Sequence, residues 1–253
     1  MMKVKILGAS GGVASGYDTT AVLINDRVLL DAGTGAFGLP PQNAINDIVL
    51  SHSHLDHTAA LCFLADNRGA DAGSLRVYCQ SETADALRAG IFNNAIWPDM
   101  ERIVINGKPM IQFFPIGKML SPMTVGGVKL SPFPVVHTVP TLGFCLHGER
   151  ETLPIMTDLG KADEAVWKWL ARKRRIRRMV IETSFPDEME KVAIDSGHLT
   201  PAMLAELVAR LPQSWKLLCC HIKPRYYAKV CAQIRAHFGK RAEILKAGRV
   251  FYL

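Results

Sequence analysis

The stretch SHSHLDH, residues 51–57, constrains this chain more than any other feature. It holds His52, His54, Asp56 and His57, although the whole chain of 253 residues has only eight histidines. The stretch follows one apolar run and precedes another, so its polar residues stand where a predicted strand ends. In an extended segment side chains alternate between faces, so His52 and His54 point the same way. Imidazole nitrogens and carboxylate oxygens are ligands that zinc, iron and manganese accept, and the stretch therefore predicts a metal site.

The composition favours one globular domain over residues 1–253. Hydrophobic residues make up 49% of the chain, and no repeat or Pro/Gly/Ser-rich linker divides it. Its apolar runs are far shorter than the roughly 20 residues that a membrane span needs. The opening MMKVKILGASGG lacks the sustained apolar core of a signal peptide. We therefore expect a cytoplasmic protein without a membrane span.

Strand patterns cluster in the first half, and strands alternate with helices in the second. Asn25-Asp26 predicts a hairpin turn, and Thr200 followed by Pro201 predicts a capped helix start. This order indicates sheets covered by helices on the outside, and leaves several α/β and α+β folds open. The expected strands are 3–10, 20–25, 28–33, 47–52, 75–80, 110–116, 127–137, 141–147, 152–158, 177–185, 215–223 and one strand or a pair over 242–253, and the expected helices are 58–66, 82–96, 163–173, 200–211 and 224–239.

The formal net charge of +7 comes in good part from the segment ARKRRIRR, residues 171–178. A basic block of this kind is usually a solvated helix end, but it also attracts phosphate-bearing ligands or nucleic acid. Charge alone does not choose between these two interpretations.

The six cysteines form no C-x-x-C pair and stand mostly in apolar surroundings. Small buried side chains in a reducing compartment are the expected interpretation. Cys219 and Cys220 directly precede His221, which leaves a role near a metal open.

H-x-H-x-D-H resembles the signature of the metallo-β-lactamase superfamily. The segment DAGTG, which contains Asp31, matches the segment that commonly precedes this signature. The resemblance implies an α+β fold, the αββα sandwich, in which two mixed β-sheets are flanked by helices and the metals lie at one edge. Asp31 is then expected to orient metal ligands without touching the substrate.

The resemblance also implies further ligands downstream, and each has a counterpart here. His137 follows a predicted strand in FPVVHTVP, Asp158 stands in LPIMTDLG, and His221 stands in LLCCHIKP. Two divalent transition-metal ions are implied, with zinc as the first choice and manganese or iron as alternatives. One ion would take His52, His54 and His137, the other Asp56, His57 and His221, and Asp158 would bridge them. His147 and His237 are assigned to no chemistry.

Two later motifs, IETSFP with Glu182 and SGHLTP with His198, narrow the reaction. From the residues alone, Glu182 and His198 read either as a surface ion pair or as a proton donor held by a carboxylate. Together these motifs resemble the class II 3′,5′-cyclic-nucleotide phosphodiesterases, as do HSHLDHTAAL, IFNNAIWPDM (91–100) and HIKP (221–224). The resemblance covers about residues 6–226.

This resemblance implies hydrolysis of cyclic AMP, cyclic GMP or both to nucleoside 5′-monophosphates. A hydroxide shared by the two metals would attack phosphorus, and His198, oriented by Glu182, would protonate the leaving 3′ oxygen. Asp56 is counted with the catalytic residues as well as with the ligands. Candidates for binding the base are Phe92, Asn93, Asn94, Trp97 and residues 183–185.

Three different functions stay open at this point. The tRNA-processing ribonucleases called tRNase Z carry a similar Glu–His pair, but usually have a long tRNA-binding arm after the third metal motif. Only 20 residues separate His137 from Asp158, which leaves no room for that arm. The second is a phosphodiesterase with a different substrate, and the third is a nucleotide sensor without turnover. We expect a small-molecule partner in place of nucleic acid and no membrane contact. The oligomeric state stays open, with a homodimer as one option because dimers are common among relatives.

Overall fold

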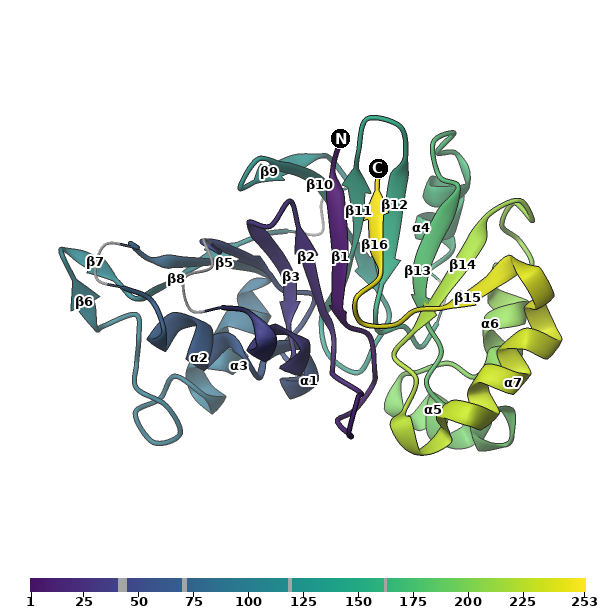
Figure 1. Ribbon diagram of the computed structural model, residues 1–253, viewed down its shortest axis with the longest axis horizontal. Coiled ribbons are helices and arrows are strands. Elements are labelled where there is room, and N and C mark those ends of the chain that lie inside the picture. Colours follow the sequence, from purple (N-terminus) through teal and green to yellow (C-terminus); the bar gives the residue numbers. More distant parts are fainter. Residues whose placement is uncertain (41–44, 70–71, 118–119, 162) are drawn as a thin grey trace.

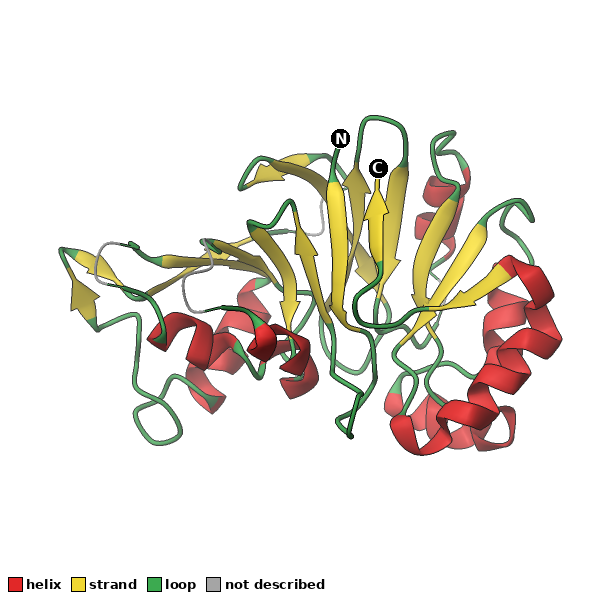
Figure 2. Ribbon diagram, in the orientation of Figure 1, coloured by secondary structure: helices red, strands yellow, loops and turns green. Residues whose placement is uncertain are grey.

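The computed structural model describes residues 1–40, 45–69, 72–117, 120–161 and 163–253. Two seven-stranded sheets lie against each other, and helices cover the outer face of each sheet (Figures 1 and 2). The expected αββα sandwich of the α+β class is confirmed. The organisation as a single domain stays a prediction.

The first sheet is mixed and contains both ends of the chain. Its strand order is β16-β1-β2-β3-β4-β5-β8, with antiparallel pairing from β16 to β3 and parallel pairing from β3 to β8. The β2–β3 hairpin turns at Asn25 and Asp26, both with positive φ (51° and 55°), as the sequence predicted. The strands are β1 (Lys3–Gly8), β2 (Ala21–Ile24), β3 (Val28–Ala32), β4 (Asp47–Val49), β5 (Leu75–Cys79), β8 (Ile111–Pro115) and β16 (Val250–Tyr252).

The second sheet is also mixed, with the order β15-β14-β13-β12-β11-β10-β9. Pairing is antiparallel from β9 to β12 and parallel from β12 to β15. The strands are β9 (Met123–Val125), β10 (Val128–Val135), β11 (Thr141–His147), β12 (Thr152–Met156), β13 (Arg178–Glu182), β14 (Lys216–Cys220) and β15 (Ala242–Ile244), and a separate small hairpin joins β6 (Val104–Ile105) to β7 (Lys108–Pro109).

Three apolar clusters hold together the four layers, which are one helix layer, the two sheets and a second helix layer. One cluster, which includes Val4, Phe144 and Leu218, lies between the two sheets. A second joins the outer face of the first sheet to its helices, and a third does the same for the second sheet. Burying apolar surface stabilises the fold by roughly 25 cal/mol per Å², so each sheet gains from covering both faces. The buried strands accordingly read as continuous apolar runs.

The helices cover the sheets as the alternating pattern predicted. Thr200 caps α6 by accepting a hydrogen bond from the amide of Met203 at 3.3 Å, and Pro201 occupies the first turn. The α-helices are α1 (Leu55–Thr58), α2 (Leu61–Asp66), α3 (Ser81–Gly90), α4 (Glu164–Ala171), α5 (Glu190–Ser196), α6 (Pro201–Val208) and α7 (Tyr227–Phe238), and the 3-10 helices are η1 (Thr34–Gly38), η2 (Asp187–Met189), η3 (Pro224–Tyr226) and η4 (Gly239–Arg241).

Two expected helices differ from the structure. The helix expected over 82–96 ends at Gly90, because Asn93 accepts hydrogen bonds from the amides of Ala95 and Ile96 and Asn94 adopts a positive φ. Short amide side chains that bond to nearby backbone compete with helix continuation in this way. The helix expected over 58–66 begins later, as α2 at Leu61, and the short helix α1 (Leu55–Thr58) precedes it.

Several strands end earlier than the sequence suggested. Strands expected to reach residues 52, 158, 185 and 223 stop at Val49, Met156, Glu182 and Cys220, so His52 lies on a loop and not on a strand. Parallel strands end at the same edge of a sheet, so the residues beyond them gather on neighbouring loops. The functional residues therefore lie on loops that a rigid sheet holds in place.

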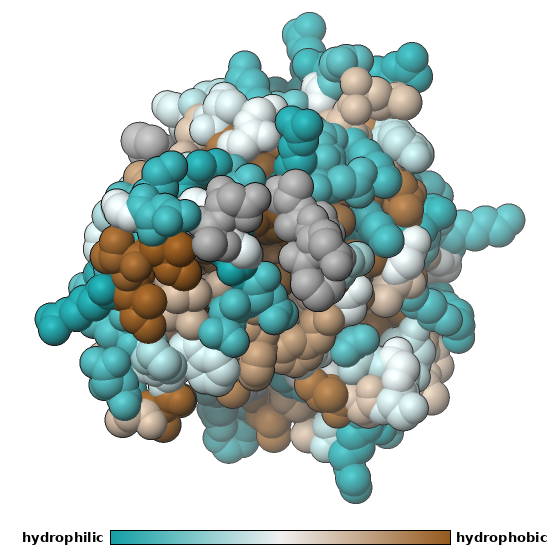
Figure 3. Space-filling model, turned by 60° about the vertical axis from the view of Figure 1, so that its left-hand side comes forward, coloured by the Kyte–Doolittle hydropathy of each residue, from teal (hydrophilic) through white to brown (hydrophobic). Residues whose placement is uncertain are grey.

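Hydrophilic side chains project over the face seen in Figure 3, and hydrophobic side chains form small groups among them. Scattered exposed apolar residues such as Val104 are ordinary on a protein surface. Within the described residues, no helix is both long enough and apolar enough to cross a bilayer. A cytoplasmic location stays a prediction.

Candidate metal centre

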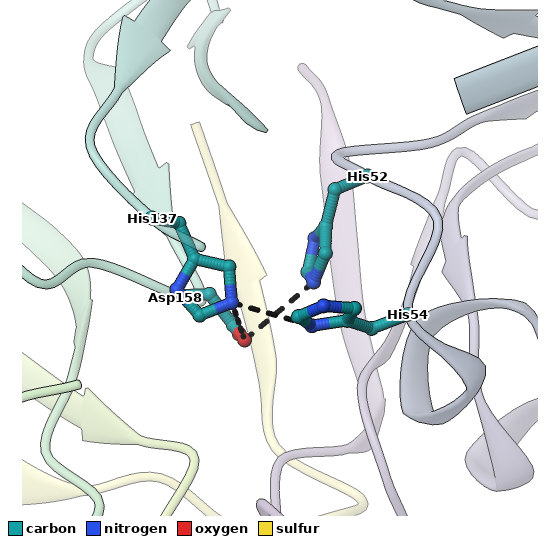
Figure 4. Close-up of side chains that lie close together, drawn as sticks. All are labelled: His52, His54, His137 and Asp158. Atoms are coloured by element: carbon teal, nitrogen blue, oxygen red, sulfur yellow. Dashed lines mark hydrogen bonds and ion pairs between the residues drawn. The ribbon is translucent and has the colours of Figure 1, made fainter. Parts of the chain in front are cut away.

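The structure brings together all seven residues that the sequence predicted as metal ligands. The ligand atoms of His52, His54, His137 and Asp158 lie within 4.8 Å of one another. Figure 4 shows these four side chains pointing toward one another. A second set, Asp56, His57 and His221, meets the same limit. The two sets lie where the ends of β4, β12 and β14 meet, although Asp56 and His221 are 165 residues apart in the chain.

Asp158 lies between the two sets and turns one oxygen toward each. Its Oδ2 is 3.6 Å from Nε2 of His52 and 3.5 Å from Nε2 of His137. Its Oδ1 is 3.0 Å from Nε2 of His57 and 3.3 Å from Nε2 of His221. A carboxylate in this position can bridge two cations.

Buried polar atoms with partners only inside the cluster show that it fits a metal. Within the described chain, Nε2 of His52, Nε2 of His57 and both carboxylate oxygens of Asp158 are buried and make ion pairs only among the ligands, such as Oδ1 of Asp158 with Nε2 of His57 at 3.0 Å. Leaving buried polar atoms without full hydrogen bonding costs about 1–3 kcal/mol each, and more for charged groups. One divalent cation in each ligand set would satisfy these atoms.

The first set favours neutral imidazoles. Burial lowers the pKa of His52, His54 and His137 below the ordinary histidine value, and neighbouring histidines add to the effect. Metals bind the unprotonated nitrogen, so these three side chains are already in the form that binds.

His57 is in a different electrostatic environment. Burial lowers its pKa, but the carboxylates of Asp158 and Asp31 outweigh that effect and hold the pKa well above the ordinary value. A cation would replace the positive charge that these two carboxylates favour.

A serine–carboxylate pair supports the ligands from beneath. Asp31, fully buried with a positive φ of 57°, accepts a hydrogen bond from Nδ1 of His57 at 2.8 Å. Ser51 donates to Asp31 at 2.9 Å, and its hydroxyl is 2.8 Å from Nδ1 of His52. Such contacts fix the ring orientation and leave Nε2 free for a metal. Asp31 was expected in this position; Ser51 was missed, although it directly precedes His52.

His198 and Glu182 form a buried pair beside the cluster. Nδ1 of His198 is 3.0 Å from Oε1 of Glu182, and Glu182 is fully buried. The His198 ring centroid is 5.0 Å from that of His221 and 5.1 Å from that of His137. The surface ion pair considered from the residues alone is therefore wrong. One His198 nitrogen also lies within 4.8 Å of ligand atoms of Asp158 and His221.

Burial of His198 acts against its charged form, and Glu182 acts for it. Burial lowers the pKa of His198, but the charge and hydrogen bond of Glu182 raise it above the ordinary value overall. Its imidazole is therefore more readily protonated near neutral pH than an ordinary histidine.

The motif IFNNAIWPDM contributes mainly to structure. Phe92 is buried in the cluster beneath the first sheet, and Trp97 packs against the same cluster. The side chains of Asn93 and Asn94 bond to backbone amides of their own turn. Among the base-binding candidates, Phe185 has its ring centroid 6.0 Å from that of His198.

The basic segment 171–178 lies away from the cluster. It joins α4 to the start of β13, whereas Glu182 is the last residue of β13. Arg178 pairs with Glu151, Arg175 donates to the carbonyl of Gly148, and Lys173 lies over the ring of Trp169. The segment is therefore at the opposite end of the strand from the site.

The six cysteines are all buried and free. Cys219 and Cys220 belong to apolar clusters on either side of β14. Neither is part of a ligand set among the described residues. Their expected role as small buried side chains is confirmed.

Two mixed sheets between helix layers, with a histidine–aspartate cluster at one edge, define the class as a metal-binding hydrolase with a metallo-β-lactamase fold. The model of the beta-lactamase superfamily domain matches residues 26–222. The chain belongs to this superfamily.

The chain is similar to two curated enzymes. A probable 3′,5′-cyclic-nucleotide phosphodiesterase of Yersinia pestis is 24% identical, over 88% of this chain and 79% of the relative. A Ribonuclease Z of Archaeoglobus fulgidus is 25% identical, over 89% of each chain. Among solved structures, unliganded yeast PDE1 superposes with a TM-score of 0.80 at 16% identity, over 100% of this chain and 99% of that one. This last likeness concerns the fold.

Proposed function

We propose that the protein hydrolyses 3′,5′-cyclic nucleotides, cyclic AMP, cyclic GMP or both, to nucleoside 5′-monophosphates. The observation that carries the proposal is the buried His198–Glu182 pair beside the ligand cluster, with 3.0 Å between Nδ1 and Oε1. A cyclic phosphodiester has a poor leaving group, an alkoxide, which needs a proton as it departs. The proposal also agrees with the names of the curated relatives from Yersinia pestis and Aliivibrio fischeri.

The chain's own residues would hold two divalent cations. His52, His54 and His137 would hold one, and Asp56, His57 and His221 the other, with Asp158 between them. When bound, such cations supply a water activated for attack and neutralise the phosphate charge. Zinc suits this donor set, and manganese or iron are alternatives.

His198 would act on the leaving oxygen. Because Nδ1 of His198 is bonded to Glu182, Nε2 is the nitrogen left to carry a transferable proton. A water that has released one proton to solvent would form the bond to phosphorus, the bond from phosphorus to the 3′ oxygen would break, and that oxygen would take the proton from Nε2. Solvent would then restore the proton on His198. Glu182 stabilises the imidazolium before transfer and holds its orientation. General-acid help of this kind is worth about 10²–10⁴-fold.

A second candidate function is tRNA 3′ processing, which the Ribonuclease Z relative of Archaeoglobus fulgidus favours. Two features argue against it. Strands β11 and β12 and a short turn fill most of the interval between His137 and Asp158, where a long arm would be inserted. The basic segment 171–178 lies at the far end of β13 from the site, so it does not contact the scissile bond.

One experiment separates the candidates. Purified, metal-loaded protein is incubated in parallel with cyclic AMP, cyclic GMP, bis(p-nitrophenyl) phosphate and precursor tRNA. We expect 5′-monophosphates from at least one cyclic nucleotide. Efficient cleavage of precursor tRNA with both cyclic nucleotides untouched would reverse the ranking, and binding of cyclic nucleotide without product would favour a sensor.

A further inference from the structure

Ser184 lies beneath the site, between the predicted metal ligand His221 and Glu182, the carboxylate that holds the predicted proton donor His198. It is fully buried. Its Oγ is 2.7 Å from Oε2 of Glu182, 3.0 Å from Nδ1 of His221, and 3.0 Å from the carbonyl oxygen of His221. As one of residues 183–185 it was a candidate for lining the substrate pocket, but it supports the site from below.

The surroundings fix which way the protons point. Nε2 of His221 faces Oδ2 of Asp56 at 3.2 Å and Oδ1 of Asp158 at 3.3 Å, so this nitrogen is the one available to a metal. Nδ1 then carries the hydrogen and donates it to the hydroxyl of Ser184. A hydroxyl has one proton to give, and the nearby carboxylate of Glu182 is its strongest acceptor.

The other carboxylate oxygen of Glu182 extends these hydrogen bonds to His198. Oε1 accepts hydrogen bonds from the amide of Leu159 at 2.8 Å and from Nδ1 of His198 at 3.0 Å. An unbroken path therefore runs from the His221 ring through the Ser184 hydroxyl and the Glu182 carboxylate to the His198 ring. Every group on it is buried, so water does not replace a missing member without cost.

We propose that Ser184 is a positioning residue that couples the second metal site to the proton donor. Its hydroxyl holds the His221 ring with Nε2 toward the metal and holds Glu182 in the orientation that bonds Nδ1 of His198 and leaves Nε2 of His198 for the substrate. His221 has a positive φ of 63°, which a non-glycine residue adopts only when its surroundings hold it there. The proposal rests on the proposed function for His198, but its effect on metal affinity does not.

The same arrangement occurs once more at the site, which supports the assignment. Ser51 stands between Nδ1 of His52 and the carboxylate of Asp31, as Ser184 stands between Nδ1 of His221 and Glu182. In the first case the carboxylate also holds a second ligand, His57. In the second case it holds His198, so the Ser184 path links a metal ligand to the proton donor.

The test compares Ser184→Ala with Ser184→Thr, which keeps a hydroxyl. The matched control is Ser131→Ala, because Ser131 is a buried serine 2.8 Å from Nε2 of His147, away from the site. Zn²⁺ is titrated into metal-free protein in competition with a chromophoric chelator. We expect Ser184→Ala to weaken one of the two sites about 10–100-fold, the usual effect of losing a ligand's supporting contact. Ser184→Thr should recover most of the affinity, and Ser131→Ala should match the wild type.

A kinetic measurement tests the second half of the proposal. At saturating metal, Ser184→Ala should lose more kcat on a cyclic nucleotide than on bis(p-nitrophenyl) phosphate, whose leaving group needs no proton. Unchanged metal affinity, or equal losses in Ser184→Ala and Ser184→Thr, would overturn the proposal, as would an equal kinetic loss on both substrates. If the wild type turns over no cyclic nucleotide, the proposed function fails, and the zinc titration still tests Ser184.

The wild-type protein offers a measurement that needs no folded variant at position 184. Nitrogen-15 spectra of the histidine rings in zinc-loaded protein should show His221 and His198 with hydrogen on Nδ1. Hydrogen on Nε2 of His221, with no hydrogen on its Nδ1, would contradict the proposed direction of the hydrogen bond from His221 to Ser184.

Discussion

Asp31 and His57 form a fully buried hydrogen bond, with 2.8 Å between Oδ2 and Nδ1, beneath the second set of ligands. Asp31 has a left-handed backbone conformation, with φ of 57°. Asparagine tolerates this conformation as well as aspartate does, so Asp31→Asn removes the charge without straining the backbone. We expect the fold to persist and affinity for one metal to fall about 10–100-fold. Zinc titration of the metal-free protein measures this, and an unchanged affinity would mean that Asp31 does not orient His57.

The two-sided position of Asp158 predicts different metal contents for different variants. The wild type should hold about two transition-metal ions per chain, because two ligand sets share this carboxylate. His57→Ala should lose mainly one ion, whereas Asp158→Ala should lower the occupancy of both sites. Elemental analysis after dialysis measures the content. A wild-type metal content near zero, which added metal does not raise, would contradict the assignment of these residues as metal ligands.

His198→Ala separates a proton donor from a metal ligand. The variant should keep both metals and lose about 10²–10⁴-fold in turnover of a cyclic nucleotide. It should lose much less on bis(p-nitrophenyl) phosphate, since nitrophenolate departs without a proton. His57→Ala is the comparison, because damage to a metal site should slow both substrates together. Loss of metal in His198→Ala would show that this residue is a ligand.

Glu182→Gln should shift the pH profile of turnover. Burial lowers the pKa of His198, but Glu182 raises it above the ordinary value, so the protonated donor persists to higher pH than for a free histidine. Cyclic-nucleotide hydrolysis should therefore decline as pH rises through that raised pKa. In Glu182→Gln the decline should begin at lower pH, because the stabilising charge is gone. Profiles of kcat/KM against pH measure this, and identical alkaline limbs would contradict the role of Glu182.

Reversing charge in the basic segment should leave the reaction unchanged. Arg172, Arg174 and Arg177 are exposed and lie before β13, at the far end of that strand from Glu182. The variant with all three changed to glutamate should match the wild type in kcat/KM on a cyclic nucleotide and in metal content. A large fall in kcat/KM with full metal content would show that this segment acts on the substrate after all.

The sequence alone determined the local elements and the residue types of the site. H-x-H-x-D-H after an apolar run was enough to predict a metal site, because donor atoms of this kind are rarely placed together on one segment. The hairpin turn at Asn25-Asp26 and the start of α6 at Thr200 also followed from local chemistry, since turn and cap preferences act over a few residues. The resemblance to a known family supplied the distant ligands.

Only the tertiary structure decided how those distant residues meet. Spacing along the chain does not show that the two oxygens of Asp158 face different ligand sets, or that Asp56 lies 3.2 Å from His221. It also did not reveal Ser184 as a link, although Glu182 and Ser184 have the two-residue spacing that places side chains on one face of a strand. These contacts depend on the pairing of the parallel strands β12, β13 and β14 and on the packing of two sheets. Burial then excludes water, so each hydrogen bond beneath the site is stronger and the loss of a partner is more costly than at the surface.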